Sequence, residues 1–294
     1  MNQNKQLKKM RDEHYKQYPY VVKVGENGCK FVDLKSVVNF ILHITYGGNT
    51  KTGVVMAFNL PIEFSCHHGC ECYNKKKCYA CGGHYAHASN QAGYMENLAY
   101  FLTHTSEEFI EYVVNDIRVN GTSRLFRWFT CGDILNERFL YCMCEVAKRL
   151  HHIKFWTYTK KYRIINTYVE KYGLEAIPEN LTIIYSHWMN EDGTFFPMEN
   201  PYDFPTSEFI PAGQEELIDT VTHLCPCSNP NVSEKCATCS TPCYELKHGE
   251  SMGLVEHSTP ATRKRDAALA AAHESIGEKV ENLVEFLKKW IIKK

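Results

Sequence analysis

The chain has 294 residues, of which 44% are apolar and 23% are charged, and its formal net charge is −1 with a pI near 6.9. This length and composition predict a soluble globular protein with one large domain, or one domain with a small appended module. The near-neutral charge gives no strong indication of a nucleic-acid partner, and no stretch approaches the roughly 18 apolar residues of a membrane span. We therefore expect a cytoplasmic protein without a membrane partner.

Cysteine is the unusual component of this chain. The sequence contains 14 cysteines, which in a reducing compartment point to metal or redox chemistry instead of disulfides. Five of them fall in the first cysteine loop, which we define as residues 66–81: Cys66, Cys70, Cys72, Cys78 and Cys81. Crowded thiolates repel one another, so a metal ion or an iron-sulfur cluster is the usual reason for such a loop. The alternative is a set of ordinary buried cysteines.

The chain around this loop has the pattern of a parallel α/β protein. Residues 1–50 contain a predicted hairpin at 18–34 and lead into a core at 51–223. Within the core, short apolar runs predict strands and 3.6-residue periodicity predicts helices. The strands are expected at 53–60, 125–130, 153–159 and 181–185, and the helices at 90–104, 105–119, 137–150 and 162–172. This alternation predicts a parallel sheet or a partial (β/α) barrel.

Polar residues follow the predicted strands at the point where each strand ends. Asp133, Lys160, Ser186 and His187 occupy these positions, and the first cysteine loop follows the first core strand. Working residues of parallel sheets gather at the carboxyl ends of strands, so we expect one edge to carry all of them. Each residue also has a structural interpretation. Asp133 fits a helix N-cap, Lys160 a solvated charge, and His187 a satisfied surface histidine.

A second group of cysteines follows a predicted long loop at 190–213 and a short helix at 215–223. We define the second cysteine segment as residues 224–260, with candidate metal ligands Cys225, Cys227, Cys236, Cys239 and Cys243. Their spacing includes a Cys-x2-Cys knuckle, which is typical of four-thiolate zinc sites and also compatible with iron-sulfur ligation. The spacing does not decide between the two metals.

The tail at 261–294 has the pattern of one long amphipathic helix. Ile276, Val280, Leu283, Leu287 and Trp290 repeat at intervals of four and three residues. Such an apolar stripe must be covered, so the helix either docks on the main domain or pairs with a second copy of the chain as a homodimer.

Several of these stretches together resemble the phage gene product eighty-eight domain family over roughly residues 50–245. The similar stretches are Phe58-Asn-Leu-Pro61, Cys78-Tyr-Ala80 at the end of the loop, Leu125–Ile134, Lys154–Lys160 and the late Cys-Pro and Cys-Ala-Thr-Cys pairs. The family looks like a distant relative of radical S-adenosylmethionine enzymes. That resemblance implies a partial barrel with a [4Fe-4S] cluster held by three thiolates of the loop after its first strand.

The loop departs from the radical enzymes' Cys-x3-Cys-x2-Cys spacing, because Cys72 comes one position early. On this basis the favoured ligands are Cys66, Cys78 and one of Cys70 or Cys72. The resemblance also implies S-adenosylmethionine as a second cofactor and a reductant protein as a partner.

We therefore predict an iron-sulfur redox enzyme of unknown substrate. Asp133, Lys160 and His187 would act in catalysis, and Ser186 would contact the cofactor. Two rivals remain, which are a zinc-stabilised binding module and an iron-sulfur electron carrier.

Overall fold

The computed structural model of the protein describes residues 3–48, 52–73, 77–190, 192–211, 215–228 and 234–255. These residues belong to a unit that ends at Val255. The predicted terminal helix at 261–294 and the last residues of the second cysteine segment lie outside the described residues. No helix within the described ranges is long and apolar enough to cross a membrane.

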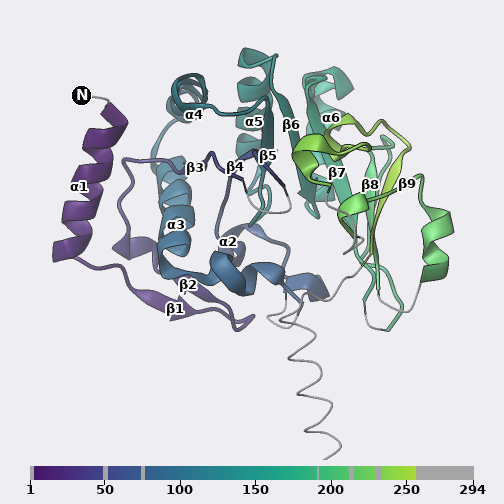
Figure 1. The fold of residues 1–294 in the computed structure, drawn as a ribbon, viewed down its shortest axis with the longest axis horizontal. Helices are drawn as coiled ribbons and strands as arrows, with labels where there is room; N and C mark the ends of the chain where they lie inside the picture. The colour runs from purple at the N-terminus through teal and green to yellow at the C-terminus, as the bar shows by residue number, and fades with distance from the viewer. Residues whose placement is uncertain are drawn as a thin grey trace, which may run out of the picture. The chain divides into compact units, whose positions relative to one another are not determined.

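A mostly parallel eight-stranded sheet organises the unit (Figure 1). Its first edge strand, β3 (Ile44–Thr45), is antiparallel to β4 (Met56–Phe58). All later pairings are parallel and follow in the order β5 (Leu125–Trp128), β6 (Lys154–Thr159), β7 (Leu181–His187), β8 (Thr206–Ile210), β10 (Ser251–Val255) and β9 (His223–Leu224). The predicted parallel sheet is confirmed, and β4 to β8 are neighbours in chain order.

The long helices between these strands pack on one face of the sheet. They are α3 (Ala88–Thr103), α4 (Ser106–Asn120), α5 (Glu137–Arg149) and α6 (Tyr162–Tyr172). Their buried residues form a single apolar cluster with alternate residues of the strands, such as Phe58, Phe126 and Phe155. The opposite face, which carries Val55, Trp156 and Ile184, is covered by residues of the second cysteine segment. The helices therefore share one face, and the second cysteine segment lies on the other.

Local sequence explains where these helices begin and end. A capping box opens α4 at Thr105, since the Thr105 hydroxyl accepts from the Glu108 N–H while the Glu108 carboxylate accepts from the Thr105 N–H. Helix α5 begins after Asn136, whose side chain accepts from the Phe139 N–H. Helix α6 ends at Gly173, which adopts a positive φ of 82°.

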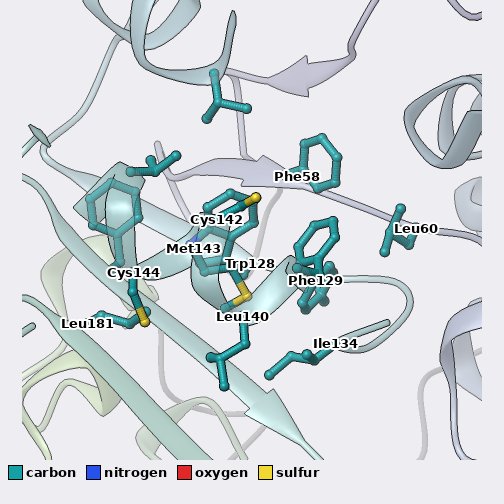
Figure 2. Close-up of a cluster of buried hydrophobic side chains, with 14 of the residues drawn as sticks. Phe58, Leu60, Trp128, Phe129, Ile134, Leu140, Cys142, Met143, Cys144 and Leu181 are labelled. Atoms are coloured by element: carbon teal, nitrogen blue, oxygen red, sulfur yellow. The ribbon is translucent and has the colours of Figure 1, made fainter. Parts of the chain in front are cut away.

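The core beneath α5 is aromatic and also contains two thiols (Figure 2). Trp128 and Phe58 pack edge to face with ring centroids 5.5 Å apart. Cys142 and Cys144, both fully buried on α5, lie among these apolar side chains in Figure 2. They therefore behave as small apolar core residues.

The ends of the described chain differ most from the sequence-based expectation. Residues 3–17 form α1 (Gln3–Gln17), which was not predicted, whereas the predicted hairpin is present as β1 (Val22–Val24) and β2 (Lys30–Val32). The expectation of a long loop at 190–213 is wrong in part, because β8 lies within it and pairs with β7. Strands β9 and β10 were also not predicted.

The remaining elements are short. A four-residue helix, α2 (Ile62–Ser65), opens the loop after β4. The 3-10 helices are η1 (Leu34–Ser36), η2 (Glu71–Tyr73), η3 (Tyr79–Cys81), η4 (Gly83–Ala86), η5 (Leu174–Ala176), η6 (Glu215–Thr220), η7 (Pro226–Ser228), η8 (Cys236–Thr238) and η9 (Cys243–Glu245). Most of them lie in the two cysteine-rich regions, where the backbone changes direction often.

Candidate metal and redox site

The carboxyl ends of β4 and β5 are joined by a network of buried polar groups. The Asn59 side-chain oxygen accepts from the Thr130 N–H at 2.8 Å, the Thr130 hydroxyl at 2.8 Å and the Cys131 N–H at 2.9 Å. The Ser65 hydroxyl donates to the Pro61 carbonyl at 2.8 Å and accepts from the Asp133 N–H at 3.1 Å. These bonds fix the start of the first cysteine loop against the turn that follows β5.

The turn after β5 has two residues with unusual backbone geometry. Phe129 adopts a φ of 60° although it is buried and not a glycine, and Gly132 adopts a φ of 93°. A Cβ atom on Gly132 would lie 2.5 Å from the Leu60 carbonyl oxygen, so only glycine fits there. Strain of this kind persists where the surrounding structure over-determines it, and it is enriched at functional sites. Here it lies on either side of Cys131.

Cys131 belongs to a cluster of five cysteines, which we call the first thiol cluster. Its members come from the hairpin, the first cysteine loop and the turn after β5, and they are Cys29, Cys66, Cys78, Cys81 and Cys131. Their apolar neighbours include Ile62, Ala80 and Tyr94. Burial raises the pKa of the Cys66 and Cys131 thiols, and nearby thiols raise both further. Cysteines from three separate parts of the chain therefore share one apolar pocket of side chains.

Two members of the first thiol cluster form a disulfide. Cys29 of the hairpin is bonded to Cys81, 52 positions later, which the expectation of metal or redox chemistry instead of disulfides did not anticipate. Cys66, Cys78 and Cys131 remain free thiols. The disulfide links the hairpin covalently to the end of the first cysteine loop.

Cys70 and Cys72 face another part of the same edge. Both contact the main apolar cluster, and Cys72 also lies beside the Lys160 ammonium group. A hydrogen bond from the Cys70 thiol, together with the positive charge of Lys160, lowers the pKa of Cys72 to about 7. Cys72 is thus the thiol of the loop that ionises most easily.

Asp133 lies at the predicted edge, where it links β5 to β6. Its carboxylate accepts from the Ile134 N–H at 2.7 Å, the Thr159 hydroxyl at 2.7 Å and the Lys160 N–H at 3.0 Å. Burial raises the pKa of Asp133, and these hydrogen bonds oppose that rise. Both carboxylate oxygens accept hydrogen bonds from these neighbouring groups. Asp133 therefore holds the turn after β5 and the end of β6 together at this edge. The N-cap of α5 is Asn136 instead.

Lys160 and Ser186 lie together as predicted, and His187 faces elsewhere. The Lys160 ammonium donates to the Ser186 hydroxyl at 2.9 Å and lies 5.3 Å from the Trp188 ring centroid. His187 is bonded through Nδ1 to the Glu208 carboxylate at 2.6 Å and stacks on Phe195. Lys160 and Ser186 therefore form one polar pair beside Cys72, while His187 bridges β7 and β8.

The second thiol cluster comprises the five predicted cysteines of the second cysteine segment, Cys225, Cys227, Cys236, Cys239 and Cys243, all of which are free and half-buried. Three of them, Cys225, Cys236 and Cys243, pack against the sheet face opposite the helices, beside Trp156 and Tyr158. The Tyr158 hydroxyl hydrogen-bonds to Cys243. This cluster lies along the middle of the strands, away from the polar pair at the carboxyl edge.

The donor set of both clusters suits soft thiophilic metals, since it consists of cysteine sulfur in crowded groups. As their side chains stand, no three His, Cys, Asp or Glu residues in the described ranges surround a common point that could hold a metal ion. Binding would therefore have to turn thiols toward one another, as expected where metal binding is coupled to local ordering.

Sequence reasoning missed Cys29, Cys131 and Arg127. Cys29 and Cys131 are isolated in the sequence, so the local density of cysteines did not identify them as candidate ligands. Cys131 could have been found from its place directly after a predicted strand, at the same edge as the first cysteine loop. Arg127 lies inside a strand, and only the structure shows that its side chain faces the second thiol cluster.

The fold and the site together define an α/β protein that has a mostly parallel sheet, with helices α3 to α6 on one of its faces, and two thiol clusters. A family model described as "Gene product 88" matches residues 36–194, which is more than half of the chain. The chain therefore belongs to the gene product 88 family. No curated protein and no solved structure matches it.

Proposed function

We propose that this protein binds an iron-sulfur cluster at the first thiol cluster and performs redox chemistry there, in the cytoplasm. The observation that carries the proposal is that three free thiols, Cys66, Cys78 and Cys131, belong to one apolar cluster at the carboxyl edge of the sheet. Three thiolates hold a [4Fe-4S] cluster with one iron open to a ligand. The ligand set expected from the first cysteine loop alone was Cys66, Cys78 and one of Cys70 or Cys72. In this proposal Cys131 replaces Cys70 or Cys72 as the third ligand.

The cluster, when bound, would supply one-electron transfer. The chain's own residues would shape the space beside it. Lys160 presents a positive charge at the edge, held in place by Ser186 and by the ring of Trp188, and suits an anionic group of a substrate or of S-adenosylmethionine. Asp133 positions the Lys160 backbone. A reductant protein is the partner that such a site requires.

Anaerobic reconstitution with iron and sulfide tests the proposal. The loaded protein should be brown, contain iron and sulfide, and bleach on reduction. Cys66→Ser and Cys131→Ser should each lose most of the cluster. Cys142→Ser is the matched control, because the Cys142 thiol lies in the core on α5 and should leave cluster content unchanged. Zinc at this site in the anaerobically purified protein, with no iron uptake, would overturn the proposal.

The open iron requires a separate measurement. Adding S-adenosylmethionine to the reduced, loaded protein should change its electron paramagnetic resonance signal, because a ligand on the open iron alters the electronic structure of the cluster. An unchanged signal together with no heat of binding would leave an iron-sulfur electron carrier as the function of the site.

A further inference from the structure

Arg127 is a cation in the middle of the sheet that has no anionic partner among the described residues. It lies on β5 between Ala57 of β4 and Trp156 of β6, on the face opposite the helices. Its Nε atom is buried and makes no hydrogen bond. No carboxylate of the described residues forms an ion pair with its guanidinium group. A poorly solvated cation is costly unless an anion lies close to it.

The groups that surround Arg127 are neutral unless the thiols ionise. The guanidinium carbon is 5.0 Å from the centre of the Tyr158 ring, which offers a cation-π contact but no negative charge. The guanidinium also lies near the half-buried thiols of Cys236 and Cys243. The phenols of Tyr79 and Tyr85 also lie near the guanidinium group. Of these neighbours, the thiols are the groups that become anions when a metal binds.

Hydrogen bonds to its main chain hold that cluster to β10, to β7 and to the turn that precedes β4. The Cys225 N–H donates to the Gly253 carbonyl at 2.9 Å, on β10. The Ala237 N–H, next to Cys236, donates to the Thr52 carbonyl at 2.9 Å. The Tyr244 carbonyl, next to Cys243, accepts from the Thr182 hydroxyl of β7 at 2.9 Å. The three sheet-facing thiols are thus fixed from three directions, although no disulfide links any of them.

We propose that the second thiol cluster is a closed, four-thiolate zinc site and that Arg127 compensates its charge. Cys225, Cys236 and Cys243 supply three ligands, and Cys239 of the Cys-x2-Cys knuckle supplies the fourth. The thiol of Cys227, the remaining cysteine, donates to the Glu234 carbonyl at 3.1 Å and hydrogen-bonds to Cys225 and Cys236, so it supports the ligands from beside the site. Zinc with four thiolates carries a net charge of −2, which Arg127 partly neutralises. The thiols release their four protons to solvent when the metal binds.

The surroundings of the second thiol cluster suit a structural metal. Four thiolates complete the tetrahedral preference of zinc and leave no open position for a substrate. The polar pair of Lys160 and Ser186 lies beside Cys72 at the carboxyl edge, in the other thiol-rich part of the molecule. The role of the metal would be to hold the second cysteine segment onto the sheet. This inference does not depend on iron binding at the first thiol cluster.

Zinc affinity, measured by competition with a chromogenic chelator, tests the role of Arg127. Arg127→Leu should bind zinc about 10- to 100-fold more weakly, which is the usual effect of removing a group that supports the ligands. Arg127→Lys keeps the charge and is the matched control, and it should stay within a few-fold of the wild type. Cys236→Ser with Cys243→Ser should lose the zinc, whereas Cys66→Ser should keep it. The Cys66→Ser protein also separates this test from that of the first site.

Two results would overturn the inference. One is wild-type zinc affinity in Arg127→Leu, and the other is an unchanged zinc content when Cys236 and Cys243 are both replaced. Should a variant fail to fold, cobalt added to the unaltered, zinc-depleted protein decides the question. A strong tetrahedral, sulfur-to-cobalt spectrum supports four thiolates, and a weak octahedral spectrum refutes them.

Discussion

The carboxylate of Asp133 should contribute more to folding than any single hydrogen bond at the edge of the sheet. Asp133→Ala removes the acceptor for the Ile134 and Lys160 N–H groups and for the Thr159 hydroxyl, all in a buried setting. Hydrogen bonds to a charged group contribute about 1.5–3 kcal/mol each, and a buried donor left without a partner costs about 1–3 kcal/mol. The cost of burying the carboxylate, which is relieved in the variant, offsets part of this sum.

We therefore expect Asp133→Ala to lower the free energy of unfolding by about 3–5 kcal/mol. Urea denaturation followed by circular dichroism measures it, and the midpoint of thermal unfolding should fall by roughly 10 °C. Thr159→Val is the matched control, since it removes one of the three bonds and the acceptor of the Lys161 N–H, and it should cost about 2 kcal/mol. Equal stabilities of the two variants would refute the bridging role and return Asp133 to a catalytic one.

Three further predictions concern the backbone, the disulfide and acid stability. Gly132→Ala should lower the free energy of unfolding by about 2–3 kcal/mol, because the added methyl group would clash with a backbone carbonyl and the residue has a positive φ. A change below about 0.5 kcal/mol in urea denaturation would contradict this. Cys29→Ser should cost about 4 kcal/mol through the loop closed by the bond to Cys81, and reducing the wild type should abolish the difference between the two proteins. The ion pair with Arg149 lowers the pKa of Glu107, so the protein should lose this stabilisation as the pH falls through that lowered pKa. At low salt, Glu107→Gln should therefore flatten the acid side of the plot of stability against pH. An unchanged plot would show that the pair contributes nothing to stability.

The regular core of the fold was predictable because its periodicity is strong. The helix predicted at 162–172 has those bounds in the structure, since its buried side chains, Ile165, Tyr168 and Val169, recur at helical spacing. The capping box at Thr105 marked the start of α4 in the same way. Helix α1 was missed because it is mostly polar and charged, with few apolar residues to show a period, and β10 because its residues Met252 and Gly253 lie in a segment interpreted only for its cysteines.

The site was predictable only where its residues are dense in the sequence. The first cysteine loop and the second cysteine segment stand out by spacing, whereas Cys29 and Cys131 each reach the first thiol cluster alone. The edge position of Lys160 and Ser186 followed from strand ends, and their mutual hydrogen bond agrees with it. The buried hydrogen bonds of Asp133 did not follow, because they depend on which donors of β6 meet the turn after β5.

The order of the strands gives a physical reason for the second thiol cluster. When parallel strands follow one another in chain order, right-handed crossovers place the connecting helices on the same face. The opposite face then exposes Trp156, Ile184 and Met252, which must be covered. Before β10, the described part of this covering segment is irregular and contains short 3-10 helices, which bury little apolar surface of their own. A segment of this kind needs cross-links to stay ordered, and a metal held by several of its thiols provides them at one point. Arg127 lies beside Cys236 on this face, and the anionic zinc site that we propose would supply the partner that its buried Nε atom lacks.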